Sequence, residues 1–155
     1  MQGSSLFAAV LVAAPLITVS ADAEECQSVY VVGNARDVVE CPADQEFDYC
    51  IIRANLVDRA GLLTGRLEFF EDFDKGSKHP QDASVNLYVA VAKITTEKGT
   101  LELLEHGIFD TKSLEFAGLA TITDGTGEFA GLAGTLTEIG HSEGTVLITG
   151  TICEG

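Results

Sequence analysis

The segment 116–137 constrains the fold most, because it contains the five residues FAGLA twice, at 116–120 and at 129–133. Between the copies lie a β-branched run, Thr121-Ile122-Thr123, and a glycine-rich turn, Asp124-Gly125-Thr126-Gly127. Glycine supplies the positive φ that hairpin turns need. The pattern therefore predicts two strands joined by a tight connection.

Alternation of β-branched or apolar residues with polar ones recurs along the chain, and no segment has the apolar periodicity of a helix. Gly, Asp and Asn separate the alternating stretches at regular intervals. We expect strands near 27–32, 36–41, 47–58, 61–70, 84–96, 99–109, 114–123, 131–139 and 144–153, and a polar loop at 71–83. This organisation predicts an all-β fold, an antiparallel barrel of eight or nearly eight strands or a sandwich.

The residues TITDGTGEFAGLAG, at 121–134, resemble a segment shared by allene oxide cyclases and dirigent proteins. In that family a short β-branched strand runs into GGTGxF, and another glycine follows five residues after the phenylalanine. Gly125, Gly127, Phe129 and Gly134 fill these positions here, and Asp124 replaces the first glycine. The resemblance implies an eight-stranded antiparallel barrel with an apolar pocket. It also implies either cyclisation of an unstable epoxide or orientation of radicals that couple without catalysis by the protein. It identifies no catalytic residue.

Residues 1–23 are predicted to be a signal peptide, which leaves 24–155 as one barrel domain. An apolar run from Leu6 to Val19 precedes a small-x-small site at Ala21-Asp22-Ala23. The run is shorter than the ~20 residues that a membrane-spanning helix needs, so we expect no span after signal removal. The chain is therefore expected to be secreted to the extracellular space or the periplasm.

The four cysteines, Cys26, Cys41, Cys50 and Cys153, predict two disulfides in an exported protein. A two-residue turn at Gly33-Asn34 would place Cys26 directly opposite Cys41, within the distance that a disulfide accepts. Cys50 and Cys153 would then pair across the first and last long strands, which closure of a barrel makes neighbours. Free thiols and a zinc site are the alternatives, and no CxxC pair supports zinc.

Charge excludes one class of partner. The chain has 24 Asp and Glu against 9 Lys and Arg, a net charge of −15. Such a surface repels phosphate backbones, so nucleic-acid binding is not expected. No phosphate-binding loop is present either, because Gly125-Thr126-Gly127 is not followed by a lysine. No cofactor or metal is expected.

Arg53, Asn55 and Tyr88 are the candidate ligand-binding residues, because each lies on a strand face that mixes apolar and polar groups. A barrel pocket for an organic ligand combines apolar walls with a few placed polar groups. The alternative places Arg53 and Asn55 on the outer face, in solvent. Glu105 and His106 are neighbours on one strand, point to opposite faces and are expected at the surface. Asp72-x-Asp74-x-Gly76 only partly matches a calcium loop, which favours a solvated acidic loop.

Three functions follow from these observations. The first is a barrel that binds an apolar small molecule and holds it in a fixed orientation. The second is a cyclase or isomerase in which a pocket acid or arginine polarises an oxygen. The third is a secreted interaction protein whose barrel is filled by side chains, since a barrel of eight strands permits either a filled core or one small ligand.

Overall fold

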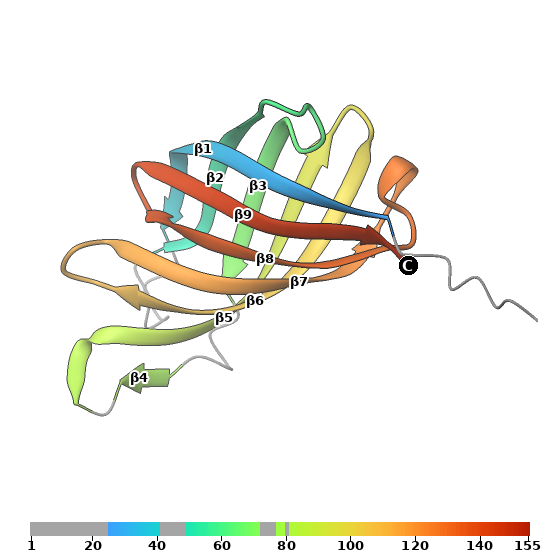
Figure 1. Cartoon of the computed structure of the whole chain (residues 1–155). Coiled ribbons are helices and arrows are strands. Elements are labelled where there is room, and N and C mark those ends of the chain that lie inside the picture. Colours follow the sequence, from blue (N-terminus) through green and yellow to red (C-terminus); the bar gives the residue numbers. More distant parts are fainter. Residues whose placement is uncertain (1–24, 41–48, 72–76, 80) are drawn as a thin grey trace, which may run out of the picture.

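The computed structural model describes residues 25–40, 49–71, 77–79 and 81–155, whose strands curl into a closed antiparallel barrel (Figure 1). The strands are β1 (Cys26–Glu40), β2 (Tyr49–Asp58), β3 (Gly65–Glu71), β4 (Ser77–His79), β5 (Asp82–Thr96), β6 (Gly99–Asp110), β7 (Glu115–Gly125), β8 (Leu132–His141) and β9 (Thr145–Glu154). Their order is β3-β2-β1-β9-β8-β7-β6-β5, and pairing of β3 with β5 closes an eight-stranded barrel. β4 is an additional short strand that pairs with β5, within the predicted 71–83 loop.

Alternation along each strand decides which side chains fill the barrel. On β5 the residues from Ser84 to Ile94 at every second position are buried, and on β6 Leu101, Leu103 and Glu105 are buried. Phe129, Leu136 and Ile148 are also fully enclosed in this core. The predicted all-β barrel is confirmed, and its interior is occupied by side chains over the described residues.

The two ends of the barrel differ in what connects the strands. One end holds Cys26, Cys153 and the 3-10 helix η1 (Gly127–Phe129). The opposite end carries the β6–β7 turn at 111–114 and the β8–β9 turn at 142–144 (Figure 1). A backbone hydrogen bond from Ser142 N to Leu114 O, 2.9 Å long, joins these two turns. We call this second end the turn end.

The predicted turn at Gly33-Asn34 is wrong, because β1 runs through it as one strand from Cys26 to Glu40. Gly33 pairs with Leu56 of β2 and with Val146 of β9. A Cβ at Gly33 would lie 2.8 Å from Leu56 Cδ2. The glycine therefore makes room for a core leucine, and hydrogen bonding to neighbours on both sides keeps the backbone extended.

The predicted disulfide pairing is wrong for the same reason. With no turn in β1, Cys26 pairs with Cys153 across β1 and β9. These two cysteines form a disulfide with a Cα–Cα distance of 4.0 Å. Cys41 and the side chain of Cys50 lie outside the described residues. The disulfide links the start of the first barrel strand to the end of the last.

The two FAGLA copies form different structures. Residues 116–120 belong to β7, whereas the second copy contains the end of η1 and the start of β8. β7 and β8 pair antiparallel, which confirms the predicted hairpin. Phe129 is fully buried, and Glu128 N donates to Lys98 O, so this connection is held against the β5–β6 turn. Gly127 has a φ of 63°.

We expect Gly127→Val to lower the free energy of unfolding by more than about 1 kcal/mol, because a β-branched residue resists positive φ. The new Cβ would also overlap with the carbonyl oxygen of Lys98. Gly61 is the matched control, since its φ is 75° but nothing lies within 4 Å of the Cβ position. Chemical denaturation should show a larger loss for Gly127→Val than for Gly61→Val. Equal losses would mean that the contact with the β5–β6 turn is unimportant.

Candidate functional site

The three predicted ligand-binding residues do not meet in one cavity. Tyr88 lies inside the barrel and is 4% exposed. Arg53 and Asn55 lie on the outer face of β2, since the intervening Ala54 and the adjacent Leu56 are buried. Arg53 Nε donates to Glu68 Oε1 over 3.0 Å and forms a half-buried ion pair on the neighbouring strand. Of the three, only Tyr88 therefore faces the interior.

Tyr88 belongs to a polar cluster with two glutamates, Glu105 of β6 and Glu138 of β8. The Tyr88 hydroxyl donates to Glu105 Oε1, and both glutamate side chains are fully buried. Two glycines make room for the cluster. A Cβ at Gly107 would overlap with the Tyr88 ring, and one at Gly118 would overlap with the Glu105 carboxyl. Gly107 and Gly118 are direct neighbours across β6 and β7.

Burial sets the protonation of this pair. It raises the pKa of Glu105 from 4.5 to about 7, against the opposing effect of the hydrogen bond from Tyr88. Burial and the adjacent Glu105 carboxylate raise the pKa of Glu138 well above its usual value. Among the described residues no donor reaches Glu105 Oε2 or either oxygen of Glu138. Because each carboxyl shifts the pKa of the other, the two titrate as an interacting pair, and burial favours the protonated form.

The prediction that Glu105 lies at the surface is wrong, whereas His106 is exposed as expected. Glu138 was not identified from the sequence. In β8, Thr135, Thr137 and Ile139 are exposed, while Leu136 and Glu138 are buried. Strict alternation would have placed Glu138 on the same buried face as Leu136. The apolar Ile139 beside it suggested the opposite, that the isoleucine points inward and the glutamate outward.

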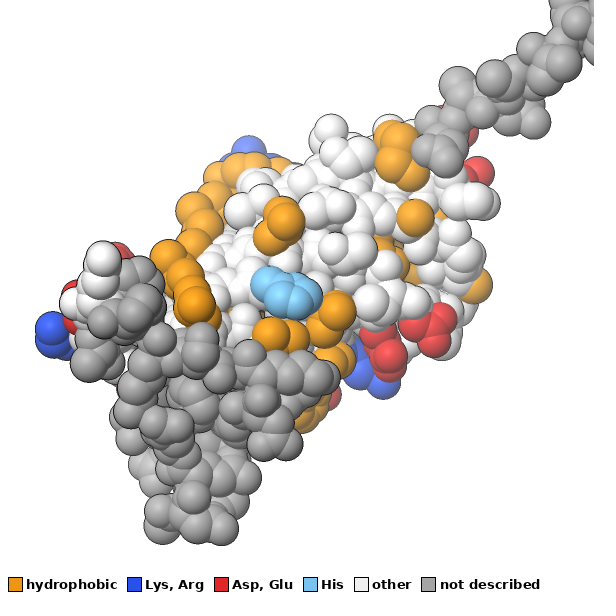
Figure 2. All heavy atoms as spheres, turned by 90° about the horizontal axis from the view of Figure 1, so that it is seen from below, with side chains coloured by type: hydrophobic (Ala, Val, Ile, Leu, Met, Phe, Trp, Pro, Cys, Tyr) orange, Lys and Arg blue, Asp and Glu red, His pale blue; other side chains and the backbone are white. Residues whose placement is uncertain are grey.

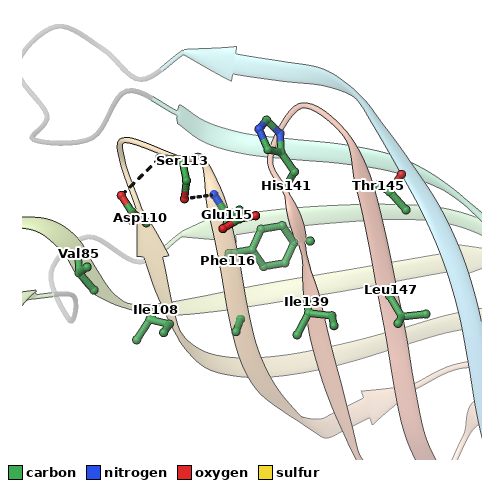
Figure 3. Close-up of a pocket in the computed structure, with 12 residues that line it drawn as sticks. Val85, Ile108, Asp110, Ser113, Glu115, Phe116, Ile139, His141, Thr145 and Leu147 are labelled. Atoms are coloured by element: carbon green, nitrogen blue, oxygen red, sulfur yellow. Dashed lines mark hydrogen bonds between the residues drawn. The ribbon is translucent and has the colours of Figure 1, made fainter.

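The turn end carries a hollow of about 830 Å³ on the outer side of the sheet (Figure 3). Its floor is a row of apolar residues that are direct neighbours across β6, β7, β8 and β9: Ile108, Ala117, Ile139 and Leu147. Ile108 and Ile139 are 48% and 45% exposed. We call this site the turn-end hollow. The apolar character of these residues would have suggested an inward position, so the sequence did not predict the hollow.

Polar groups lie on one side of the turn-end hollow, where the two turns meet. Asp110 Oδ1 accepts from Lys112 N at 2.8 Å and from Ser113 N at 3.4 Å, which shapes the β6–β7 turn. His141 Nδ1 accepts from Glu143 N at 3.1 Å, which shapes the β8–β9 turn. Nε2 is then the nitrogen that carries the proton of a neutral His141. Glu115 and Thr145 complete the polar side.

The backbone of the β6–β7 turn is strained. Leu114 has a φ of 60°, the only positive value of a non-glycine residue in the described part of the chain. Leu114 N donates to Asp110 O, and Leu114 O accepts from Ser142 N. Strained backbone is found where surrounding contacts hold it, commonly at binding sites. The two hydrogen bonds of Leu114, with Asp110 and with Ser142, hold this backbone conformation. The same bonds fix the two turns that form the polar side of the turn-end hollow.

The remaining candidates are placed as follows. His141 lines the turn-end hollow, and the side chain of His79 is not among those described. Asp72 and Asp74 of the acidic segment lie outside the described residues. Residues 1–23, the predicted signal peptide, also lie outside them. Within the described ranges, no helix has the length and apolar character needed to cross a bilayer.

No protein-family model matches the chain, and no curated protein is found to be similar to it. The resemblance of 121–134 to allene oxide cyclases and dirigent proteins therefore stays a prediction. What is established is an eight-stranded antiparallel barrel with a Cys26–Cys153 disulfide.

Proposed function

We propose that this chain is an exported barrel that binds a mainly apolar small molecule in the turn-end hollow and holds it in one orientation. The observation that supports this function is the combination of an aliphatic floor with polar groups on a single side. The volume of about 830 Å³ falls within the range of roughly 300–1,000 Å³ that is typical of ligand pockets.

The lining indicates the class of ligand. Ile108, Ala117, Ile139 and Leu147 offer contact to a hydrocarbon or aromatic body. At the turns, His141 Nε2 can donate to a carbonyl or hydroxyl oxygen, and Glu115 can accept from a hydroxyl. A molecule with an oxygen group at one end would therefore lie with that end toward the two turns. Such fixed orientation is the contribution expected of a dirigent-like protein, which supplies position and no nucleophile.

Burial of the acid pair favours binding over the alternative cyclase or isomerase function. A carboxyl with a pKa near 7 suits acid–base catalysis at neutral pH. However, the side chains of Glu105 and Glu138 are fully enclosed, and neither residue lines the turn-end hollow. A general acid must reach its substrate within hydrogen-bond distance or through one water. The pair is better explained as part of the barrel interior.

Export is supported by the disulfide between Cys26 and Cys153, since such bonds persist mainly in oxidising compartments. The predicted cleavage site before Glu24 provides the test. N-terminal sequencing of the protein recovered outside the cell should begin at Glu24 or within a few residues of it. Recovery of an extracellular product that still begins with Met1 would contradict the signal peptide.

The binding proposal predicts that Ile139→Asp weakens binding of a neutral apolar dye such as Nile red by at least about tenfold. A dye bound on the floor would cover the new carboxylate and remove its water without supplying a hydrogen bond, which costs free energy. Fluorescence titration measures the affinity. Val57→Asp is the matched control, since Val57 is an outward aliphatic residue, 64% exposed, that does not line the turn-end hollow. Arg53→Ala should also leave the affinity unchanged. Equal weakening by Ile139→Asp and Val57→Asp would mean that the dye binds exposed apolar surface in general.

A further inference from the structure

An uncharged band covers the outer face of six neighbouring strands. It consists of three successive outward residues on each strand, which the strand register aligns into three rows. From β5 to β1 the members are Leu87, Val89 and Val91; Ile108, His106 and Leu104; Ala117, Leu119 and Thr121; Ile139, Thr137 and Thr135; Leu147, Thr149 and Thr151; and Val32, Tyr30 and Ser28. None of them is Asp, Glu, Lys or Arg. We call this surface the uncharged band.

The band combines ten aliphatic residues and Tyr30 with seven uncharged polar residues, which are threonine, serine and histidine. Tyr30, Leu119 and Ile108 are 61%, 55% and 48% exposed, and further exposed aliphatic residues lie beside them. Figure 2 shows, on the face seen from below, hydrophobic side chains grouped around a histidine with acidic ones toward one margin. By register, His106 lies between Val89 and Leu119. Contiguous exposed apolar surface of this kind marks interaction sites in soluble proteins.

On β5, β6 and β7, charged residues lie next to the band along the strands. On one side, Glu68, Lys93 and Glu102 occupy neighbouring strands, and Lys93 Nζ lies 3.5 Å from Glu102 Oε1. On the other side, Asp110 and Glu115 are neighbours across β6 and β7. On β8, β9 and β1 the uncharged surface continues beyond the three rows, through Ala133, Cys153 and Cys26 at one end and His141, Thr145 and Asn34 at the other.

We propose that the uncharged band is where a second copy of this chain docks, centred on Leu119 of β7 in the second row. Two copies with a net charge of −15 repel each other wherever carboxylates face carboxylates. When the bands of two copies face each other, no carboxylate of one copy lies against a carboxylate of the other. The apolar residues of the two bands can then pack together without charge repulsion. A cationic partner would instead bind the acidic residues, which lie outside the band.

The size of the band suits this occupant. A standard protein–protein interface uses roughly 20–30 residues on each side. The three rows on six strands approach that number before any flanking residue is added. The surface also matches itself, because aliphatic residues and threonines can pack against the same types on another copy. The contact is centred outside the turn-end hollow, since Leu119, Thr135 and Thr137 do not line it, and the band overlaps the hollow only in its first row, at Ile108, Ala117, Ile139 and Leu147.

The test is the molar mass of the purified protein in solution, measured by sedimentation velocity at about 10–100 µM in 0.15 M salt, where the Debye length is ~8 Å. The wild type should sediment as an assembly of two or more chains. Leu119→Glu should shift the mass to that of one chain, because it places carboxylates against each other at the centre of the contact. Thr137→Glu, a polar replacement at an exposed position, should do the same and does not depend on the loss of an apolar residue.

Thr95→Glu is the matched control, since Thr95 is exposed on the outer face of β5 beyond the band. It should sediment like the wild type. A wild type that sediments as a single chain across this concentration range overturns the proposal. An assembly that survives both Leu119→Glu and Thr137→Glu also overturns it. If Leu119→Glu does not fold, as judged by circular dichroism, Thr137→Glu decides the outcome.

Discussion

Replacing Cys26 and Cys153 together by serine should lower the free energy of unfolding by about 2–5 kcal/mol. The bond joins residues 127 positions apart, so it closes a loop that includes the whole barrel. In the chain-entropy model, the stabilisation that comes from constraining the unfolded chain grows with loop length. It approaches about 5 kcal/mol for a loop of this size. Because β1 and β9 are already paired in the barrel, the folded state should change little.

Denaturant unfolding of the oxidised wild type and of the double variant measures this loss. Non-reducing peptide mapping of the wild type should recover a Cys26–Cys153 link, and the variant should lack it. An unchanged denaturation midpoint would contradict a stabilising role for the bond. Recovery of a Cys26–Cys41 link would contradict the pairing of β1 with β9.

The acid pair should make the protein more stable in mild acid than at pH 8, by about 3 kcal/mol for Glu105 alone. Burial raises the pKa of Glu105 to about 7 in the folded state, from 4.5. The folded protein therefore binds a proton more tightly than the unfolded chain does. This contribution is fully present below pH 4.5 and is lost as the pH rises through about 7. The raised pKa of Glu138 acts in the same direction.

The double variant Glu105→Gln/Glu138→Gln should lose this part of the pH dependence, because neither amide titrates. Repulsion among the many surface carboxylates also changes with pH, so the comparison needs a matched control. Glu115→Gln removes one exposed carboxyl and should keep the pH profile of the wild type. Denaturant titrations from pH 4.5 to 8 provide the free energies. A double variant with the wild-type pH dependence would mean that the pair is not protonated in the fold.

Alternation and turn residues predicted most of the barrel, because each strand of an antiparallel barrel has one buried face. The predicted strands at 84–96, 99–109 and 144–153 differ from β5, β6 and β9 by at most two residues at either end. The error at Gly33-Asn34 arose because the dipeptide is typical of turns, whereas here β1 hydrogen bonds to β2 and β9 on both sides. The disulfide pairing depended on that turn and failed with it.

The site was harder to predict than the strands. Arg53 and Asn55 were assigned to a mixed face, and only the burial of Ala54 and Leu56 shows which face of β2 is internal. The turn-end hollow combines residues of five strands, β5 to β9, with two turns that are joined by one backbone hydrogen bond. Its aliphatic floor breaks the rule that apolar residues point inward. The residue pattern of one strand does not show which residues of other strands and turns will lie beside it.

The central claim, that the turn-end hollow binds a mainly apolar molecule, is tested most directly by methyl chemical shifts in the ¹³C-labelled protein. Protein purified from its natural source is first analysed by native mass spectrometry for a bound molecule, and that molecule or Nile red is then titrated. We predict shifts at Ile108, Ile139 and Leu147, with little change at the buried Leu103 and Ile148. Shifts at Leu103 and Ile148 with none at Ile139 would place the ligand inside the barrel and contradict the claim.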